Sequence, residues 1–190
     1  YDSLKKDGYV KRYLNFAEIP IGELPGTWYL LGRVNTTVNE LRACAKDAGL
    51  YYGDNRGNKS FDTKQWRAIK AWTKISKGKS IKKHDAEIMM RYIREIKDHS
   101  YRRTGFWIEL PDTQEYDFDG LCDWCGLNLN DEAAAKPWWE ILQRNFTATQ
   151  TENFIRLLKR YGQSSLDKDP QIIIDTIHSV KGEEANNVLL

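Results

Sequence analysis

The sequence predicts an α/β protein whose parallel sheet is interrupted by a mostly helical insertion. Strand, helix and strand patterns follow one another within residues 28–52, which is the right-handed crossover unit of a parallel sheet. A further buried-strand pattern appears only at residues 171–177, and helical periodicity dominates the long stretch between them. We therefore expect a sheet domain at residues 1–60 and 166–190, with an inserted helical subdomain at residues 61–165.

The first strand–helix–strand unit is predicted from local signals. Residues 28–34 form an aromatic and aliphatic run of strand length. Residues 37–40 have the sequence of a capping box, which starts a helix, and Gly49 stands where a left-handed residue would end it. Residues 50–52 then resume as a second short strand. The apolar positions at helical spacing between these signals are Leu41, Cys44, Ala45 and Ala48.

Two helices are expected at the start of the insertion. Asp62 or Thr63 can cap the first of them, and Gly78 can end it. Asp85 can open the second. The apolar stripes expected to be buried are Trp66, Ile69, Trp72 and Ile75 on the first helix, and Ile88, Met89, Tyr92, Ile93 and Ile96 on the second.

The rest of the insertion is predicted to hold a loop and two further helices. Residues 111–119 are acidic and contain a proline, so a loop is expected there. Pro137 suits the first turn of a helix containing Trp138, Ile141 and Leu142. Residues 149–152 have capping-box form, and Gly162 is the expected stop of the helix that follows. The apolar stripe of this last helix is Phe154, Leu157, Leu158 and Tyr161.

Two strands are predicted near the end of the sequence. The β-branched run at residues 171–177 is typical of a strand buried on both faces, as parallel strands are. Residues 187–190 begin another strand. Both would join the sheet that starts near residue 28.

The composition fits a globular protein and argues against a membrane-spanning one. Hydrophobic residues make up 41% of the chain and charged residues 29%. No apolar run approaches the roughly 20 residues that a spanning helix needs. Residues 1–7 lack an initiator Met and an apolar signal core, so we expect an internal start.

The cysteines favour a reducing, cytoplasmic setting. Cys44, Cys122 and Cys125 are an odd number and too few for a disulfide framework. Cys122 and Cys125 have metal-like spacing, but no second Cys or His pair lies at the distance of a zinc finger. Two ordinary thiols are therefore favoured over a zinc site, and no metal site is predicted.

Charge is distributed unevenly along the insertion. Residues 64–103 hold thirteen Lys or Arg against four Asp or Glu, whereas residues 109–132 hold eight Asp or Glu and no Lys or Arg. The basic block also contains four Trp or Tyr residues, which suits a polyanionic partner, although solvated helix faces would give the same count. Trp138 and Trp139 could stack on bases, but burial of at least one of them is favoured.

Two predicted strands end in side chains that can contact anions. In an open parallel sheet, ligands bind at the carboxyl ends of the strands. Arg33 leaves the first strand and could aim its guanidinium at a phosphate, or form an ordinary surface salt bridge. Residues 176–184, which follow the last buried strand, combine hydroxyls, an imidazole, a Lys and a Gly. These groups are typical of a loop that contacts phosphate oxygens.

The segment at residues 176–185, Thr-Ile-His-Ser-Val-Lys-Gly-Glu-Glu-Ala, resembles motif V of the UvrD/Rep-like superfamily 1 helicases. The usual form of that motif is T-[IL]-H-[SR]-x-K-G-L-E-[FA]. Glu183 departs from it, because Leu is common there. Residues 30–35, the helix that follows and residues 49–52 are similar to motif IV of the same family. Both motifs belong to the second RecA-like motor domain, in which an inserted, largely helical subdomain separates them.

This resemblance implies an ATP-dependent DNA helicase that translocates on single-stranded DNA, with 3′ to 5′ polarity expected, and that unwinds duplex DNA in repair or replication. Arg33 matches the catalytic Arg that reaches the γ-phosphate. Glu184 matches a nucleotide contact, with Lys181 and Gly182 beside it in the same segment. The positions matched to the surroundings of the single-stranded DNA backbone and of the ATP site are Thr176, His178 and Ser179. Lys82 and Lys83 of the basic block would add further DNA contacts.

Other parts of such a motor have no counterpart in this sequence. No G-x-x-x-x-G-K-[ST] loop is present, and no acidic pair for Mg²⁺ follows an apolar strand. ATP and Mg²⁺ would then be bound mainly by the first RecA-like domain of the same full-length protein, and this chain alone is expected to be inactive. The alternative is a non-catalytic nucleic-acid-binding or regulatory module with a degenerate helicase fold.

Overall fold

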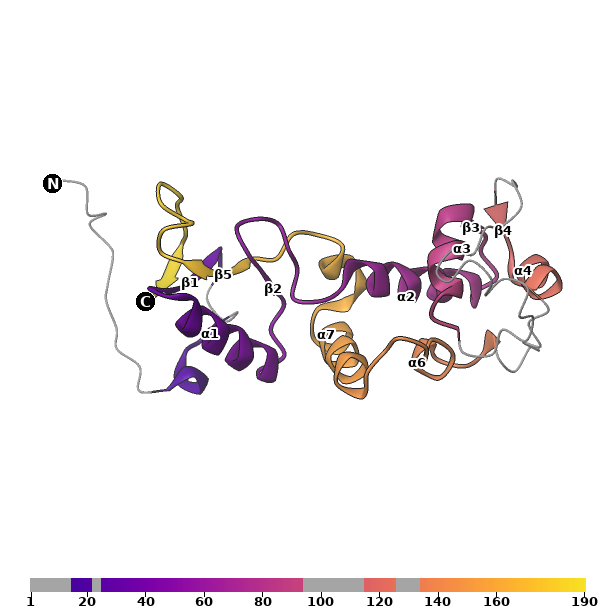
Figure 1. Ribbon diagram of the computed structural model, residues 1–190, viewed down its shortest axis with the longest axis horizontal. Coiled ribbons are helices and arrows are strands. Elements are labelled where there is room, and N and C mark those ends of the chain that lie inside the picture. Colours follow the sequence, from indigo (N-terminus) through magenta and orange to yellow (C-terminus); the bar gives the residue numbers. More distant parts are fainter. Residues whose placement is uncertain (1–14, 22–24, 94–114, 126–133) are drawn as a thin grey trace, which may run out of the picture. The chain divides into compact units, whose positions relative to one another are not determined.

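The computed structural model describes residues 15–21, 25–93, 115–125 and 134–190 (Figure 1). The chain divides into two compact units, Tyr1–Ser60 with Arg160–Leu190, and Phe61–Lys159. The fold is α/β: a four-stranded parallel sheet with helices belongs to the first unit, and the second is mainly helical with a small antiparallel strand pair.

The sheet of the first unit has the strand order β2-β5-β1-β6. β1 (Trp28–Gly32) pairs in parallel with β5 (Ile172–Thr176) and with β6 (Asn187–Leu189), while β2 (Tyr52–Gly53) pairs with β5. The predicted strands therefore form one parallel sheet. The first two strands along the chain are not neighbours, because β5 lies between them.

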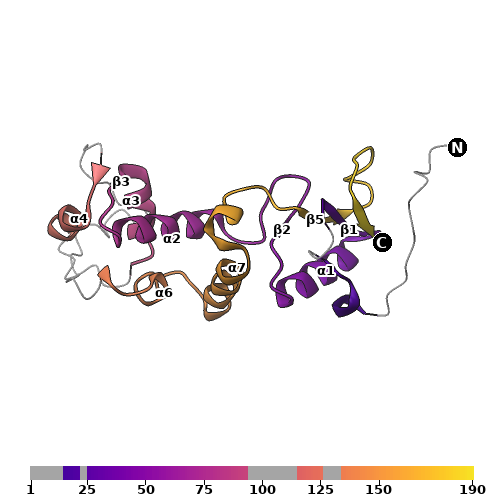
Figure 2. The same cartoon turned by 180° about the vertical axis from the view of Figure 1, so that it is seen from behind.

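One face of the sheet is covered by α1 (Asn35–Asp47), and the 3-10 helix η1 (Phe16–Glu18) adds to the same apolar cluster. Figures 1 and 2 both show α1 along one side of the strands. Within this cluster the fully buried side chains are Leu30, Ala45 and Ile174. The remaining buried members are Ile21, Trp28, Val38, Leu50 and Ile172.

The start of α1 differs from the prediction. The helix begins at Asn35, after the extended residue Val34, and no side chain caps it, so the expected capping box at residues 37–40 is wrong. Cys44 is exposed rather than part of the buried stripe, and so is Ala48, because the helix turns Val38 and Ala45 toward the sheet. The predicted left-handed ending is confirmed: Gly49 has φ +63°.

The opposite face of the sheet is covered by residues that follow β5. Val180 packs on Tyr29 and Leu31, and Ile173 and Ala185 join this second cluster. In Figure 1 the segment after β5, drawn in yellow, lies on the other side of the strands from α1. Ile173 is only half-buried, so burial of β5 is more complete on the α1 face.

In the second unit, the first two helices along the chain pack against a pair of short antiparallel strands. α2 (Thr63–Ile75) starts at the predicted cap, because the Asp62 carboxylate accepts hydrogen bonds from the backbone N–H groups of its first turn. α3 (Lys83–Met90) follows β3 (Ile81–Lys82), which pairs with β4 (Glu115–Tyr116). The predicted stripe on α2 is buried, and so are Ile88 and Met89 on α3. The second helix is shorter than predicted: Tyr92 and Ile93 are buried but lie beyond its end at Met90, and Ile96 lies outside the described residues. Asp85 lies in the first turn of α3 rather than at its cap and accepts a hydrogen bond from Arg67.

The remaining helices are α4 (Phe118–Cys125), α6 (Trp138–Ile141) and α7 (Ala148–Leu166). The loop expected at residues 111–119 is wrong in part, since its described portion contains β4 and the start of α4. The second capping box lies two positions earlier than predicted: Thr147 and Gln150 exchange hydrogen bonds at the start of α7. Gly162, with φ +70°, interrupts α7 as expected.

No helix of the described residues has the length and apolar character to cross a bilayer.

Candidate functional site

The ends of β1 and β5 lie side by side at the carboxyl edge of the sheet. Gly32 is in register with Thr176, and the Ile177 N–H donates to the Gly32 carbonyl at 3.1 Å. Arg33 therefore leaves the sheet next to the segment that follows β5. Its side chain is exposed, and no carboxylate in the described part of the chain pairs with it. The guanidinium is thus available to an anion.

Gly32 itself is required at this edge. A Cβ atom built on it would lie 2.9 Å from both the backbone nitrogen and the Cγ2 atom of Val38. The first turn of α1 can pass this close to the end of β1 only because position 32 has no side chain.

The first half of the segment that follows β5 is held by its own hydroxyl groups. We call residues 177–185 the β5 loop. The Ser179 hydroxyl donates to the Thr176 carbonyl at 2.8 Å, and the Ser179 N–H donates to Thr176 Oγ1 at 3.3 Å. These bonds close a turn at the strand end. Both hydroxyls therefore shape the loop, whereas the His178 side chain is exposed to solvent.

The second half of the β5 loop is fixed to the sheet face by Val180 and Glu183. The Tyr29 hydroxyl donates to Glu183 Oε2 at 3.0 Å. Burial of Tyr29, reinforced by this bond to a carboxylate, raises its pKa above the ordinary value. Glu183, which stands where the resembled motif commonly has Leu, thus makes a polar attachment where an apolar one would be expected.

The three residues predicted to contact a nucleotide follow Val180 and lie on both sides of Glu183. Lys181 and Glu184 are exposed, and neither has an ion-pair partner among the described residues. Gly182 has φ +91°, and nothing lies within 4 Å of the position its Cβ would take. Glycine is therefore needed there for the left-handed backbone. Arg33, Lys181, Gly182 and Glu184 all follow β1 or β5 at the same edge.

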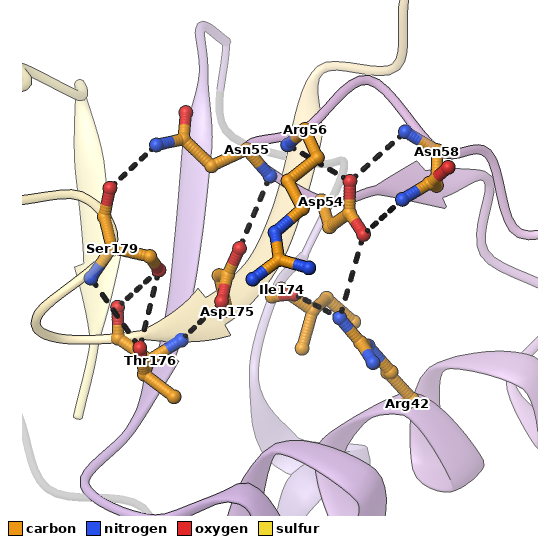
Figure 3. A network of polar contacts seen from close by, with 9 residues as sticks. All are labelled: Arg42, Asp54, Asn55, Arg56, Asn58, Ile174, Asp175, Thr176 and Ser179. Carbon is orange, nitrogen blue, oxygen red and sulfur yellow. Dashed lines mark hydrogen bonds and ion pairs between the residues drawn. The ribbon is translucent and has the colours of Figure 1, made fainter.

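The sequence reasoning missed a polar network beside this loop (Figure 3). Asp175, the penultimate residue of β5, accepts hydrogen bonds from the N–H groups of Thr176 at 2.7 Å and Asn55 at 3.2 Å. The Asn55 side chain donates to the Ser179 carbonyl at 2.5 Å. The turn after β2 is thereby tied to the start of the β5 loop. A polar Asp-Asn pair directly after the predicted second strand was the signal that could have revealed it.

Asp54 organises the turn after β2. Its carboxylate accepts hydrogen bonds from the Arg56 N–H and the Asn58 N–H, each at 2.9 Å, and from the Asn58 amide. Arg42 lies 3.9 Å from the same carboxylate and donates to the Ile174 carbonyl. Burial acts to raise the pKa of Asp54 and of Asp175, but their hydrogen bonds and the nearby guanidinium outweigh it, so both pKa values are lowered.

Lys82 and Lys83 belong to the second unit, whereas the strand-end residues belong to the first. Lys82 is exposed at the end of β3, and Lys83 is half-buried at the start of α3. The exposed face of α2 also carries cations and α2 contains no Asp or Glu. Its cations are Lys64, Arg67, Lys70 and Lys74, of which Arg67 is paired with Asp85.

Two other candidate features can now be placed. Trp138 is buried and Trp139 is 42% exposed, so one member of the pair belongs to the core, as expected. Cys44 is exposed and Cys122 is half-buried. Within the described ranges, no group of three or more His, Cys, Asp or Glu is arranged to hold a metal ion.

Comparisons of this chain with models of protein families, with curated proteins and with solved structures gave no match. The residues at the carboxyl edge of the sheet and their arrangement are therefore the basis for a functional proposal.

Proposed function

We propose that this chain is the second RecA-like motor domain, with a helical insertion, of a UvrD/Rep-like superfamily 1 DNA helicase. The observation that carries the proposal is the in-register pairing of β1 with β5, which makes Arg33 and the β5 loop neighbours at one carboxyl edge. These are the segments that resemble motifs IV and V. Because ligands of open parallel sheets bind at this edge, both segments can serve one site.

The nucleotide side of the proposed site consists of Arg33, Lys181, Gly182 and Glu184. ATP with Mg²⁺, bound mainly by the first motor domain, supplies the phosphoryl transfer. Arg33 is exposed and unpaired among the described residues, so it can reach across to the γ-phosphate and stabilise the charge that develops there. Glu184 can accept a hydrogen bond from a ribose hydroxyl, and Lys181 can meet a phosphate.

The proposed nucleic-acid contacts of the first unit are Thr176, His178 and Ser179, and those of the second unit, taken by itself, are Lys82 and Lys83. The exposed imidazole of His178 can donate to a phosphate, while the two hydroxyl residues fix the loop that presents it. The two lysines would add sequence-independent contacts to single-stranded or duplex DNA, which weaken with salt.

The proposed setting is the cytoplasm, and the proposed partner is the first RecA-like domain of the same full-length protein. That domain would supply the phosphate-binding loop and the Mg²⁺-binding carboxylates. The 190-residue chain on its own should then bind nucleic acid without hydrolysing ATP, and translocation from 3′ to 5′ is the expected polarity of the complete motor.

The test is the ATPase rate of the full-length protein with and without single-stranded DNA, measured beside the 190-residue chain. DNA-stimulated hydrolysis by the full-length protein alone is expected. Arg33→Ala should lower kcat by a factor of about 10³ or more while leaving ATP binding largely intact, since Arg contacts of this kind act on the transition state. Lys46→Ala removes an exposed cation from α1 and is the matched control.

Two outcomes would contradict the proposal. Unchanged turnover in Arg33→Ala would remove the catalytic role of this residue. A full-length protein that binds DNA but hydrolyses no ATP would instead favour the non-catalytic nucleic-acid-binding or regulatory module.

A further inference from the structure

The turn that connects β2 to residue Lys59 is held in one shape by its own backbone. We call residues 54–58 the β2 turn. The Asp54 N–H donates to the Asn58 carbonyl at 3.0 Å, and the Gly57 N–H donates to the Asp54 carbonyl at 3.1 Å. Gly57 takes φ +82°, which other residues rarely adopt. Because the Asp54 carboxylate also accepts from two N–H groups of the turn, the shape does not depend on the side chain of residue 56.

The β2 turn is fixed to the start of the β5 loop. Asn55 makes both connections, through its N–H to Asp175 and through its side-chain amide to the Ser179 carbonyl (Figure 3). Arg56 is the next residue along the turn. It is therefore presented at the carboxyl edge of the sheet, beside the segment that we propose contacts nucleic acid.

Arg56 is an arginine that the fold itself does not use. Its side chain is exposed, and among the described residues no carboxylate forms an ion pair with it. Two other arginines of this unit have structural partners: Arg42 donates to the Ile174 carbonyl and lies beside Asp54, and Arg160 donates to the Ala48 carbonyl. An unpartnered guanidinium on a rigid turn can accept an anion at little conformational cost.

The strand order indicates which anion Arg56 binds. In the order β2-β5-β1, Arg56 follows β2 and Arg33 follows β1, so the two arginines lie on opposite sides of β5. The nucleotide contacts that we propose include Arg33, on the β1 side. Arg56 neighbours Asn55, which is bonded to Ser179 on the other side. A phosphate of a nucleic-acid strand fits this position better than a nucleotide triphosphate does.

We propose that Arg56, presented by the β2 turn, binds a backbone phosphate of single-stranded nucleic acid and extends the strand-contact surface from the β5 loop across to β2. This inference depends on the proposed function for its ligand. The segments that resemble motifs IV and V follow β1 and β5, and this inference adds the β2 turn as a third segment of the same site.

The experiment measures binding of a fluorescein-labelled oligothymidylate to the 190-residue chain by anisotropy, over a series of salt concentrations. Arg56→Gln should weaken binding about fivefold or more and reduce the slope of log affinity against log salt by about 0.7 to 1, the effect of one lost phosphate contact. Arg56→Lys should restore most of the slope. Lys46→Gln, which removes an exposed cation of the same unit, should leave the slope unchanged.

A second arm uses a fluorescent ATP analogue. Arg56→Gln should leave the affinity of the full-length protein for the analogue unchanged, because the proposed ligand is the strand. Weaker analogue binding with unchanged oligonucleotide binding would overturn the inference in favour of the nucleotide. Circular dichroism and thermal unfolding of the variant should match the unchanged chain, since the turn is built by backbone groups.

The remaining outcomes separate this inference from the proposed function. If the salt dependence of oligonucleotide binding has the same slope in Arg56→Gln as in the unchanged chain, the role of Arg56 is wrong but the proposed function stands. The same holds if Lys46→Gln loses as much affinity as Arg56→Gln does. Failure of the unchanged chain to bind the oligonucleotide overturns both.

Discussion

Asp175→Asn should loosen the contact between the β2 turn and the β5 loop. The carboxylate of Asp175 accepts hydrogen bonds from two backbone N–H groups, on Thr176 and Asn55, through different oxygen atoms. The substitution keeps the shape of the side chain but replaces one oxygen with a donor. One N–H group must then face an NH₂ group, and one hydrogen bond to a charged acceptor is lost.

The magnitude follows from the type of bond that is removed. A hydrogen bond to a charged group contributes about 1.5–3 kcal/mol when buried. Because Asp175 is only half-buried, we expect a loss of about 1–2 kcal/mol in the free energy of unfolding at pH 7. Urea unfolding measures this loss, and amide hydrogen exchange should show that the N–H groups of residues 55 and 176 lose protection first. Glu40→Gln, at an exposed carboxylate of α1, is the control.

The pH dependence gives the decisive comparison. The pKa of Asp175 in the folded protein is lowered below its ordinary value of 3.8. Its contribution is therefore fully present above about pH 3.8, and it is lost as the pH falls through the lower, folded-state pKa. The unchanged protein and Asp175→Asn should thus converge in stability in strong acid. A difference that stays constant from pH 7 down to acid would refute the assignment of the effect to the ionised carboxylate.

Three further predictions test the packing, a buried hydroxyl and the basic surface. Gly32→Ala should destabilise the protein by about 1–3 kcal/mol in urea unfolding, because the new Cβ would lie 2.9 Å from the Val38 backbone nitrogen. Burial raises the pKa of Tyr51 to about 12, so the stability contributed by its neutral hydroxyl should be fully present below about pH 10 and be lost as the pH rises from there to about 12. An ultraviolet titration should show this late tyrosine, and Tyr51→Phe should remove it. Replacing Lys82 and Lys83 with Gln should weaken oligonucleotide binding and flatten its salt dependence; an unchanged salt slope would show that these lysines contact no phosphate.

Local signals in the sequence predicted helix ends correctly where the candidate residues were few and adjacent. Of the two candidates for the cap of α2, Asp62 and Thr63, Asp62 is the one used, and Gly49 follows α1 in the left-handed conformation that glycine adopts without strain. The capping box predicted before Phe154, at residues 149–152, was placed two positions too late. The bonds formed by Thr147 and Gln150 show that the box at residues 147–150 is the one used. Two capping sequences of similar strength differ little in free energy, so the tertiary packing of the helix selects between them.

Strand order could not be predicted, since it depends on contacts between distant parts of the chain. β5 separates β1 from β2 although more than 100 residues lie between β5 and either strand. The dependence on distant contacts also explains which site residues were predicted from the sequence and which were missed. Arg33 and residues 176–184 follow long, buried strand patterns, so the rule about strand ends identified them. Asn55 follows a two-residue strand and acts through Asp175 and Ser179, which a local pattern cannot reveal.

The attachments of the β5 loop separate the residues that build it from those that can contact a ligand. Its start is held from the β2 side by Asn55, and its later part is held on the β1 side by Val180 and by the bond from Tyr29 to Glu183. The exposed side chains of the same loop, on His178, Lys181 and Glu184, have no structural partner in the described part of the chain. Substitutions of the first group should therefore alter stability and binding together, whereas substitutions of the second should alter binding alone. A loop whose two ends are fixed by different strands can present its free side chains to a nucleotide and to a nucleic-acid strand with little loss of conformational entropy on binding.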